Sequence, residues 1–209
     1  MDYLQQLIES YPLLEGIKND INDAYETIIE SFSRGGKLLI AGNGGSASDA
    51  EHIVCELMKN FVKKRKLPEV FQKKIESFDP DISGYLLPRL QPGLPAISLS
   101  GHSSLNTACI NDIDGNITFS EQVYGYGKPG DIFLGISTSG NSKNILYATA
   151  TAKARELKTI ALTGNDGGLL KTLADISIIV PEKETYKIQE LHLPVYHCLC
   201  HMIEEYFFE

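Results

Sequence analysis

Two hydrophobic patterns alternate along this chain. Short apolar runs without helical spacing predict buried strands, and they occur at Leu38–Ile40, Ile97–Leu99, Asp131–Ile136, Thr159–Leu162 and Ile176–Val180. Segments with helical periodicity follow these runs, which is typical of parallel strands joined by right-handed helical crossovers. The pattern therefore predicts an α/β fold, a three-layer αβα sandwich around a central parallel sheet.

Amphipathic helices flank this alternating region. In residues 1–36, apolar positions recur at helical spacing from Leu14 to Phe32, and Gly35-Gly36 ends the pattern. This N-terminal helical extension has an apolar face suited to the core or to contact between subunits. A last helix is expected from Leu191 to Phe208.

The alternation breaks between the first two predicted strands. Residues 65–94 are interrupted by Pro68, Pro80, Pro88 and Pro92, and the segment begins within the basic cluster Lys63–Lys66. We expect a surface insertion with a helix from Glu69 to Phe78, and a basic cluster exposed to solvent. Because little chain lies on either side for a second domain, residues 1–209 are predicted to form a single domain.

Composition narrows the function. A net charge of −8 over 209 residues argues against nucleic acid, which proteins usually bind through basic surfaces. No apolar run is long enough to span a membrane, and no signal-peptide pattern precedes the first helix, so we expect a cytoplasmic protein. A small anion remains compatible with this acidity, because backbone N–H groups at a helix start bind phosphate locally.

A loop rich in hydroxyl groups, Ser137-Thr138-Ser139-Gly140-Asn141-Ser142, follows the third predicted strand. Turn and helix-capping roles account for one or two of the four hydroxyls, whereas a phosphate site uses all of them together with the next helix start. Neither a P-loop lysine nor a dinucleotide fingerprint is present, so the loop predicts binding of a sugar phosphate rather than a nucleotide.

His52 and Glu56 lie four residues apart on the helix that Ser46 opens, and therefore on one face. They suit either a simple charge pair or two metal ligands. Gln189 and His197 are further candidates, although one straight helix would separate them by about 12 Å. Either the helix bends back near Pro194, or the ligands come from two subunits. His201 is interpreted equally well as a packed residue or as a ligand.

Four segments together, GNGGSASDAEHIVCEL, ISTSGNSKNI, LTGNDGG and IQELHLPVYHCLCHMIE, resemble the SIS (sugar isomerase) domain family. Within that family they are most similar to the phosphoheptose isomerases, and the resemblance covers most of the chain. It implies interconversion of sedoheptulose 7-phosphate and D-glycero-D-manno-heptose 7-phosphate, which supplies heptose for a cell-surface glycan. It also implies a homotetramer with active sites at subunit interfaces and one zinc ion per subunit.

The resemblance assigns residues to these roles. The zinc ligands that it implies are His52, Glu56, Gln189 and His197. The substrate contacts that it implies are Asn43, Gly44, Gly45, Glu56, Asn111, Asp112, Ser137, Thr138, Ser139, Ser142 and Gln189. The chain departs from the family at two places: the segment 65–94 is longer, and Tyr186 replaces an expected aspartate, which bears on sugar specificity.

An aldose–ketose isomerase moves a proton between adjacent carbons through an enediol, so it needs a base and an acid. We expect Glu56 to be the base and His197 the acid, with zinc orienting the substrate oxygens or stabilising their charge. Two alternatives remain. One is a non-catalytic SIS protein that senses a sugar phosphate or binds a protein, as the replication-initiation partners in this superfamily do, and the other is an isomerase of a different sugar phosphate.

Overall fold

The centre of the fold is a parallel sheet with the strand order β2-β1-β3-β4-β5, seen in a computed structural model that describes residues 2–208. The strands are β1 (Leu38–Ala41), β2 (Ala96–Ser98), β3 (Ile132–Ser137), β4 (Lys158–Gly164) and β5 (Ile176–Val180). In register, Leu39 lies beside Ile97 and Phe133, and Ser137 lies beside Thr163. All five predicted strands are present, with ends that differ by at most two residues.

The helices surround this sheet in the order of the chain. They are α1 (Tyr3–Ser10), α2 (Lys18–Ser33), α3 (Gly45–Met58), α4 (Glu69–Glu76), α5 (Pro80–Leu86), α6 (Ser103–Asp112), α7 (Thr118–Tyr126), α8 (Lys143–Ala154), α9 (Leu170–Leu173) and α10 (Thr185–Phe207). Short 3₁₀ helices are also present at Pro12–Ile17, Leu99–Gly101 and Gly115–Ile117. Within residues 2–208, no helix combines the length and apolar character that a membrane crossing requires.

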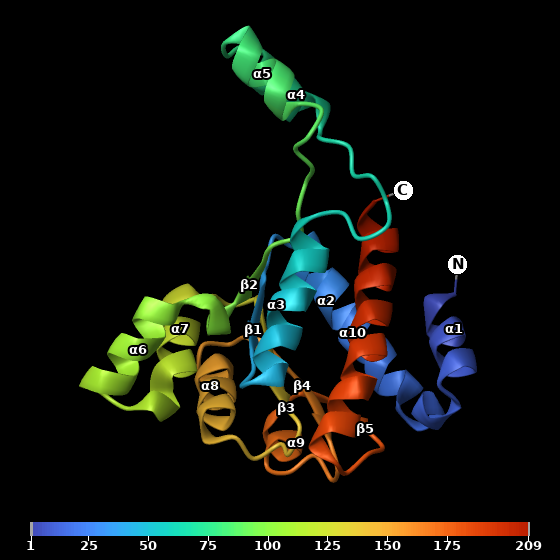
Figure 1. Cartoon of the computed structure of the whole chain (residues 1–209), viewed down its shortest axis with the longest axis vertical. Helices are drawn as coiled ribbons and strands as arrows, with labels where there is room; N and C mark the ends of the chain where they lie inside the picture. Colours follow the sequence, from blue (N-terminus) through green and yellow to red (C-terminus); the bar gives the residue numbers. More distant parts are fainter. Residues whose placement is uncertain (1, 209) are drawn as a thin grey trace.

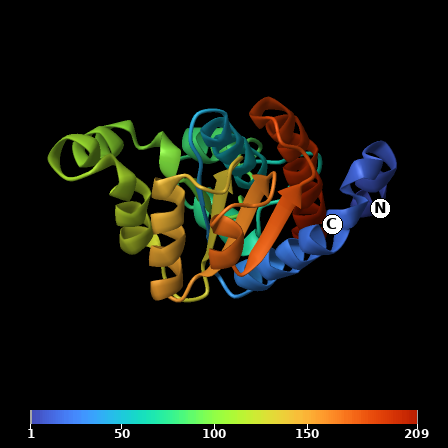
Figure 2. The same cartoon turned by 90° about the horizontal axis from the view of Figure 1, so that it is seen from below.

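Two apolar cores lie on opposite faces of the sheet. One joins α1, α2, α3 and α10 to side chains such as Leu38 and Leu134, and the other joins α7, α8 and α9 to side chains such as Leu39 and Phe133. Figure 2 shows α2 and α8 on the two sides of the strands. Because both faces are covered, β1 and β3 are buried along their whole length, which explains their continuous apolar runs. The predicted three-layer sandwich is confirmed.

The N-terminal region is divided into three pieces rather than one long helix. The 3₁₀ turn from Pro12 to Ile17 separates α1 from α2, so α2 begins at Lys18 and not near Leu14. Proline is favourable in a first helical turn but disfavours the continuation of a preceding helix. The division lets α1 fold back onto α10, with Leu4 and Leu7 in the core.

The segment after α3 forms an arm that projects from the body of the molecule (Figure 1). Its helices α4 and α5 contain no buried residue. Glu69–Glu76 is helical as predicted. The expectation that Lys63–Lys66 is uniformly exposed is wrong at one position, because Arg65 is almost completely buried.

The last helix, α10, starts at Thr185 and runs through Pro194 to Phe207. Proline in a helix interior removes one backbone hydrogen bond. Here both halves of the helix are held by burial, with Ile188 and Leu191 before the proline and Val195 and Leu199 after it. The hypothesis that the helix bends back at Pro194 is therefore wrong.

Candidate functional site

The loop between β1 and α3 brings the start of α3 against α10. Gly44 has a φ of +55°, in the left-handed region that favours glycine, and it turns the chain into the helix. At Gly45 a Cβ atom would lie 2.5 Å from Nε2 of Gln189, so a larger residue would displace the end of that side chain. Gln189 thus packs directly against the backbone at the beginning of α3.

A cavity of about 340 Å³ lies beside this contact. Its lining residues are Asn43, Gly44, Gly45, Ser46, Ile136, Ser137, Thr138, Ser142, Thr185 and Gln189. The strand order reverses between β1 and β3, which is where α/β proteins of this kind bind ligands. Most of the predicted substrate contacts therefore share one cavity.

The hydroxyl-rich side of the cavity is built at the start of α8. The Oγ atoms of Ser137 and Ser142 are 3.1 Å apart, and Ser142 directly precedes the first residue of the helix. Asn144 in the first turn of α8 exchanges amide hydrogen bonds of 2.8 and 3.0 Å with Asn43. This arrangement places hydroxyls at the positive end of a helix dipole, which suits a phosphate group.

Four predicted contacts lie outside the cavity lining: Glu56, which belongs to a separate cluster described below, and Ser139, Asn111 and Asp112. The Oγ atom of Ser139 accepts a hydrogen bond from the backbone N–H of Asn141, within the turn itself. Asn111 and Asp112 lie at the exposed end of α6, where the amide of Asn111 donates to the carboxylate of Asp112 over 2.7 Å.

A cluster of ligand-type side chains lies further along the same pair of helices. Nε2 of His52 is 3.2 Å from Oε1 of Glu56, and the rings of His52 and His197 stand edge to face with centroids 5.0 Å apart. Oε2 of Glu56 accepts a hydrogen bond from Lys59 over 3.1 Å. We call the facing residues Gly45, His52 and Glu56 on α3 and Gln189 and His197 on α10 the α3–α10 seam.

The environment of His197 favours its neutral form. Burial, together with the nearby His52, lowers the pKa of His197 below its ordinary value, while Glu56 opposes this shift. Its Nε2 atom is buried and has no hydrogen-bond partner. A neutral imidazole with an unpartnered nitrogen suits a metal ligand or a proton-transfer group.

Tyr196 and Asp49 form a hydrogen-bonded chain at the Nδ1 atom of His52. The Tyr196 hydroxyl lies 3.0 Å from Nδ1 of His52 and donates a long hydrogen bond, 3.4 Å, to Oδ1 of Asp49. Burial and Asp49 raise the pKa of Tyr196, so the hydroxyl keeps its proton. With that proton directed at Asp49, the hydroxyl accepts from Nδ1–H of His52, which leaves Nε2 as the nitrogen that faces Glu56 and that would face an ion.

The donors of the cluster fit zinc, because imidazole and carboxylate groups are common zinc ligands and Nε2 of His197 is orphaned. In the part of the chain that the structure describes, no group of three or more His, Cys, Asp or Glu side chains is already arranged to hold an ion. His52 and Glu56 bond to each other instead. An ion would have to replace that contact. Gln189 lies two helical turns before His197, over Gly45.

His201 is a packed residue rather than part of the cluster. Its ring stacks on Tyr3 with centroids 4.8 Å apart and lies against Phe61 at 4.3 Å. The structure therefore favours the packing interpretation that the sequence left open for this histidine.

Sequence reasoning did not single out several residues that shape the site. Ser46, Ile136 and Thr185 line the cavity, Lys59 binds Glu56, and Tyr196 and Asp49 support His52. One signal was available for Tyr196, since it lies seven residues after Gln189 and therefore on the same face of α10.

Known proteins resemble this chain over nearly its whole length. The family described as SIS domain matches residues 75–164. A phosphoheptose isomerase from Helicobacter pylori is 40% identical over 194 residues, which cover 93% of this chain and 88% of that protein. The structure of a phosphoheptose isomerase from Neisseria gonorrhoeae has a TM-score of 0.76 at 31% identity and covers 96% of this chain and 94% of its own. One from Francisella tularensis has a TM-score of 0.78 at 32% identity and covers 97% and 95%.

Proposed function

The chain belongs to the phosphoheptose isomerase family, and we propose that it interconverts sedoheptulose 7-phosphate and D-glycero-D-manno-heptose 7-phosphate. The observation that carries this function is that the cavity and the cluster around His52 and His197 lie along the same pair of helices, α3 and α10. From Gly45 to His52 the rise along α3 is about 10 Å, a span that an extended sugar phosphate of six or seven carbons can cover. A phosphate bound at Ser137 and Ser142 therefore leaves the other end of the sugar near the histidines.

Glu56 and His197 suit the two proton-transfer roles. The reaction removes a proton from C1 of the ketose and returns one to C2, while a second proton moves between the two oxygens. The Glu56 carboxylate takes and returns the carbon-bound proton. His197, which faces the cluster from α10, moves the second proton between the two substrate oxygens.

The proposal includes one zinc ion per subunit, held by His52, Glu56 and His197. Because α10 continues straight through Pro194, the fourth ligand that the family resemblance implies, Gln189, would come from a neighbouring subunit. When bound, zinc would supply Lewis-acid stabilisation of the negative charge that develops on the two substrate oxygens. The orphaned Nε2 of His197 and the orientation of His52, whose Nε2 faces Glu56, support this ligand set.

The support of His52 by Tyr196 gives a direct test of the ligand set. Tyr196→Phe removes the hydroxyl that holds Nδ1, and it is expected to weaken zinc binding by about 10–100-fold. Competition with a chromophoric chelator measures this affinity without any need for turnover. Tyr206→Phe, an exposed tyrosine on the same helix, is the matched control. Equal zinc affinity in wild type and Tyr196→Phe would contradict the assignment.

We also propose that the protein is a homotetramer in which α6 reaches a neighbouring site. Asn111 and Asp112 lie away from the cavity of their own subunit, and Ile110 and Ile113 beside them are 61% and 64% exposed. A subunit contact over α6 would bury these side chains and bring Asn111 and Asp112 to another site.

Turnover across five-, six- and seven-carbon ketose phosphates tests the function. We expect the highest kcat/KM with sedoheptulose 7-phosphate, and no product from unphosphorylated sedoheptulose tested alongside. Binding of these sugars without turnover of any, in protein loaded with zinc, would point instead to a sugar-phosphate sensor. Faster turnover of a shorter sugar would identify a different isomerase.

A further inference from the structure

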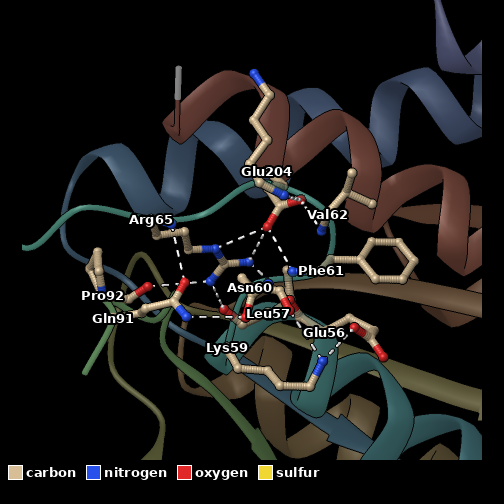
Figure 3. Close-up of polar contacts among 11 residues, drawn as sticks. Glu56, Leu57, Lys59, Asn60, Phe61, Val62, Arg65, Gln91, Pro92 and Glu204 are labelled. Atoms are coloured by element: carbon tan, nitrogen blue, oxygen red, sulfur yellow. Dashed lines mark hydrogen bonds and ion pairs between the residues drawn. The ribbon is translucent and has the colours of Figure 1, made fainter. Parts of the chain in front are cut away.

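A buried ion pair joins the end of α3, the end of α10 and the root of the arm (Figure 3). NH2 and Nε of Arg65 lie 3.0 and 3.1 Å from Oε1 of Glu204, and the two side chains are 0% and 2% exposed. Removing both charges from water is costly, so such a pair persists only where each group is also satisfied by further hydrogen bonds.

The remaining donors of Arg65 reach the last turn of α3. NH1 donates to the carbonyl of Leu57 over 2.6 Å, and NH2 donates to the carbonyl of Glu56 over 3.0 Å. The final carbonyls of a helix have no partner within it, and the helix dipole places partial negative charge there. The guanidinium therefore caps α3 with both hydrogen bonds and charge.

Glu204 holds the chain that leaves α3. Its carboxylate accepts hydrogen bonds from the backbone N–H groups of Phe61 and Val62, each over 2.8 Å, and of Lys63 over 3.1 Å. Burial alone would raise the pKa of Glu204, but these donors and Arg65 lower it. Both members of the pair are thus bonded on several sides, as Figure 3 shows.

This network bears on the candidate catalytic residues through the backbone. Arg65 contacts the backbone of Glu56 itself, and Glu204 follows His197 by two turns on α10. The side chain of Glu56 is bonded to His52 and Lys59, whose side chains are 41% and 61% exposed. The buried pair is therefore a rigid tie between the backbone that carries Glu56 and the helix that carries His197.

We propose that Arg65 and Glu204 are positioning residues for the isomerisation, because they hold the last turn of α3 against α10 and so set Glu56 opposite His197. This inference rests on the proposed function. A purely structural role would only fasten the root of the arm, where Gln91 bonds to the backbone of Arg65 and to Asn60.

Arg65→Lys separates these two roles. Lysine keeps a positive charge beside Glu204, but one ammonium group cannot reproduce the planar fork that also reaches two carbonyls. We expect kcat to fall by about 10–100-fold with KM nearly unchanged, because small displacements of catalytic groups have effects of this size. Hydrogen exchange of the backbone amides at residues 55–59 is expected to become faster.

Lys63→Met is the matched control. Lys63 joins the same segment to the same helix through an ion pair of 3.0 Å with Glu205, but it makes no contact with the carbonyls of α3. This variant is expected to retain wild-type kcat and wild-type exchange at residues 55–59. If Arg65→Lys does not fold, Glu204→Gln takes its place, since it keeps the side-chain shape and one carbonyl acceptor.

The outcomes distinguish this proposal from the function on which it rests. Lack of turnover by the wild type contradicts the function, whereas the exchange measurement still reports on the tie. Wild-type kcat in a folded Arg65→Lys or Glu204→Gln variant overturns the positioning role. A loss of stability with an unchanged kcat per folded molecule leaves Arg65 as a structural residue only, and it also overturns the proposal.

Discussion

Replacing Glu56 with Gln is expected to lower kcat for sedoheptulose 7-phosphate by about 10²–10⁴-fold, the contribution of a positioned general base. The amide has nearly the same shape as the carboxylate but cannot accept the proton from carbon. Glu56 is largely buried, and its contacts with His52 and Lys59 lie on the surface of α3 rather than in the apolar core. The variant is therefore expected to fold.

Two measurements accompany this prediction. Inhibition by inorganic phosphate should be unchanged, because the proposed phosphate contacts, Ser137 and Ser142, line the cavity, whereas Glu56 does not. Glu51→Gln, an exposed glutamate on the same helix, should retain full turnover. Undiminished turnover by a folded Glu56→Gln variant would remove Glu56 from the mechanism.

Removing zinc with a chelator is expected to have the second largest effect, a loss of turnover of about 10²-fold or more, from several kcal/mol of Lewis-acid stabilisation. Adding zinc back should restore the activity. Phosphate binding should survive in the metal-free protein, since the cavity lining includes only Gln189 from the proposed ligand set.

Elemental analysis before and after chelation makes this test decisive. A preparation shown to hold no divalent metal, and still fully active, would contradict the proposed zinc site. It would leave the isomerase reaction itself to Glu56 and His197 alone.

The sheet and its order of elements could be predicted from sequence because its signal is local. Strands such as β1 and β3 are buried on both faces, so their apolar runs are continuous, and the loops after them carry the glycines and hydroxyls of the cavity. The helix α7 gave no comparable signal. Its buried residues include Thr118 and Gln122, so the buried face is partly polar.

The seam could be predicted only in part. His52 and Glu56 are four residues apart on one helix, and this spacing is visible in the sequence. The pairing of Arg65 with Glu204 spans 139 residues and depends on the tertiary fold, so Arg65 reads as one member of a solvated basic cluster. Tyr196 behind His52 was missed for the same reason, since 144 residues separate them.

Pro194 illustrates how packing overrides a local rule. The residue type argues against a continuous helix, yet buried side chains on both sides hold α10 together across it. As a result Gln189 stays at the cavity end of the seam and His197 at the cluster, about 12 Å apart along the helix axis.

Glu56 is expected to transfer a proton between the two carbons of a bound heptose phosphate. The most direct test is incubation of zinc-loaded wild type and Glu56→Gln with sedoheptulose 7-phosphate in D₂O, followed by proton NMR. We predict that the wild type forms the aldose with deuterium at C2 in at least part of the product, because the carboxyl proton exchanges with solvent. The variant should form almost no product. No aldose from the wild type would contradict the isomerase activity, and equally fast formation by both proteins would contradict the role of Glu56.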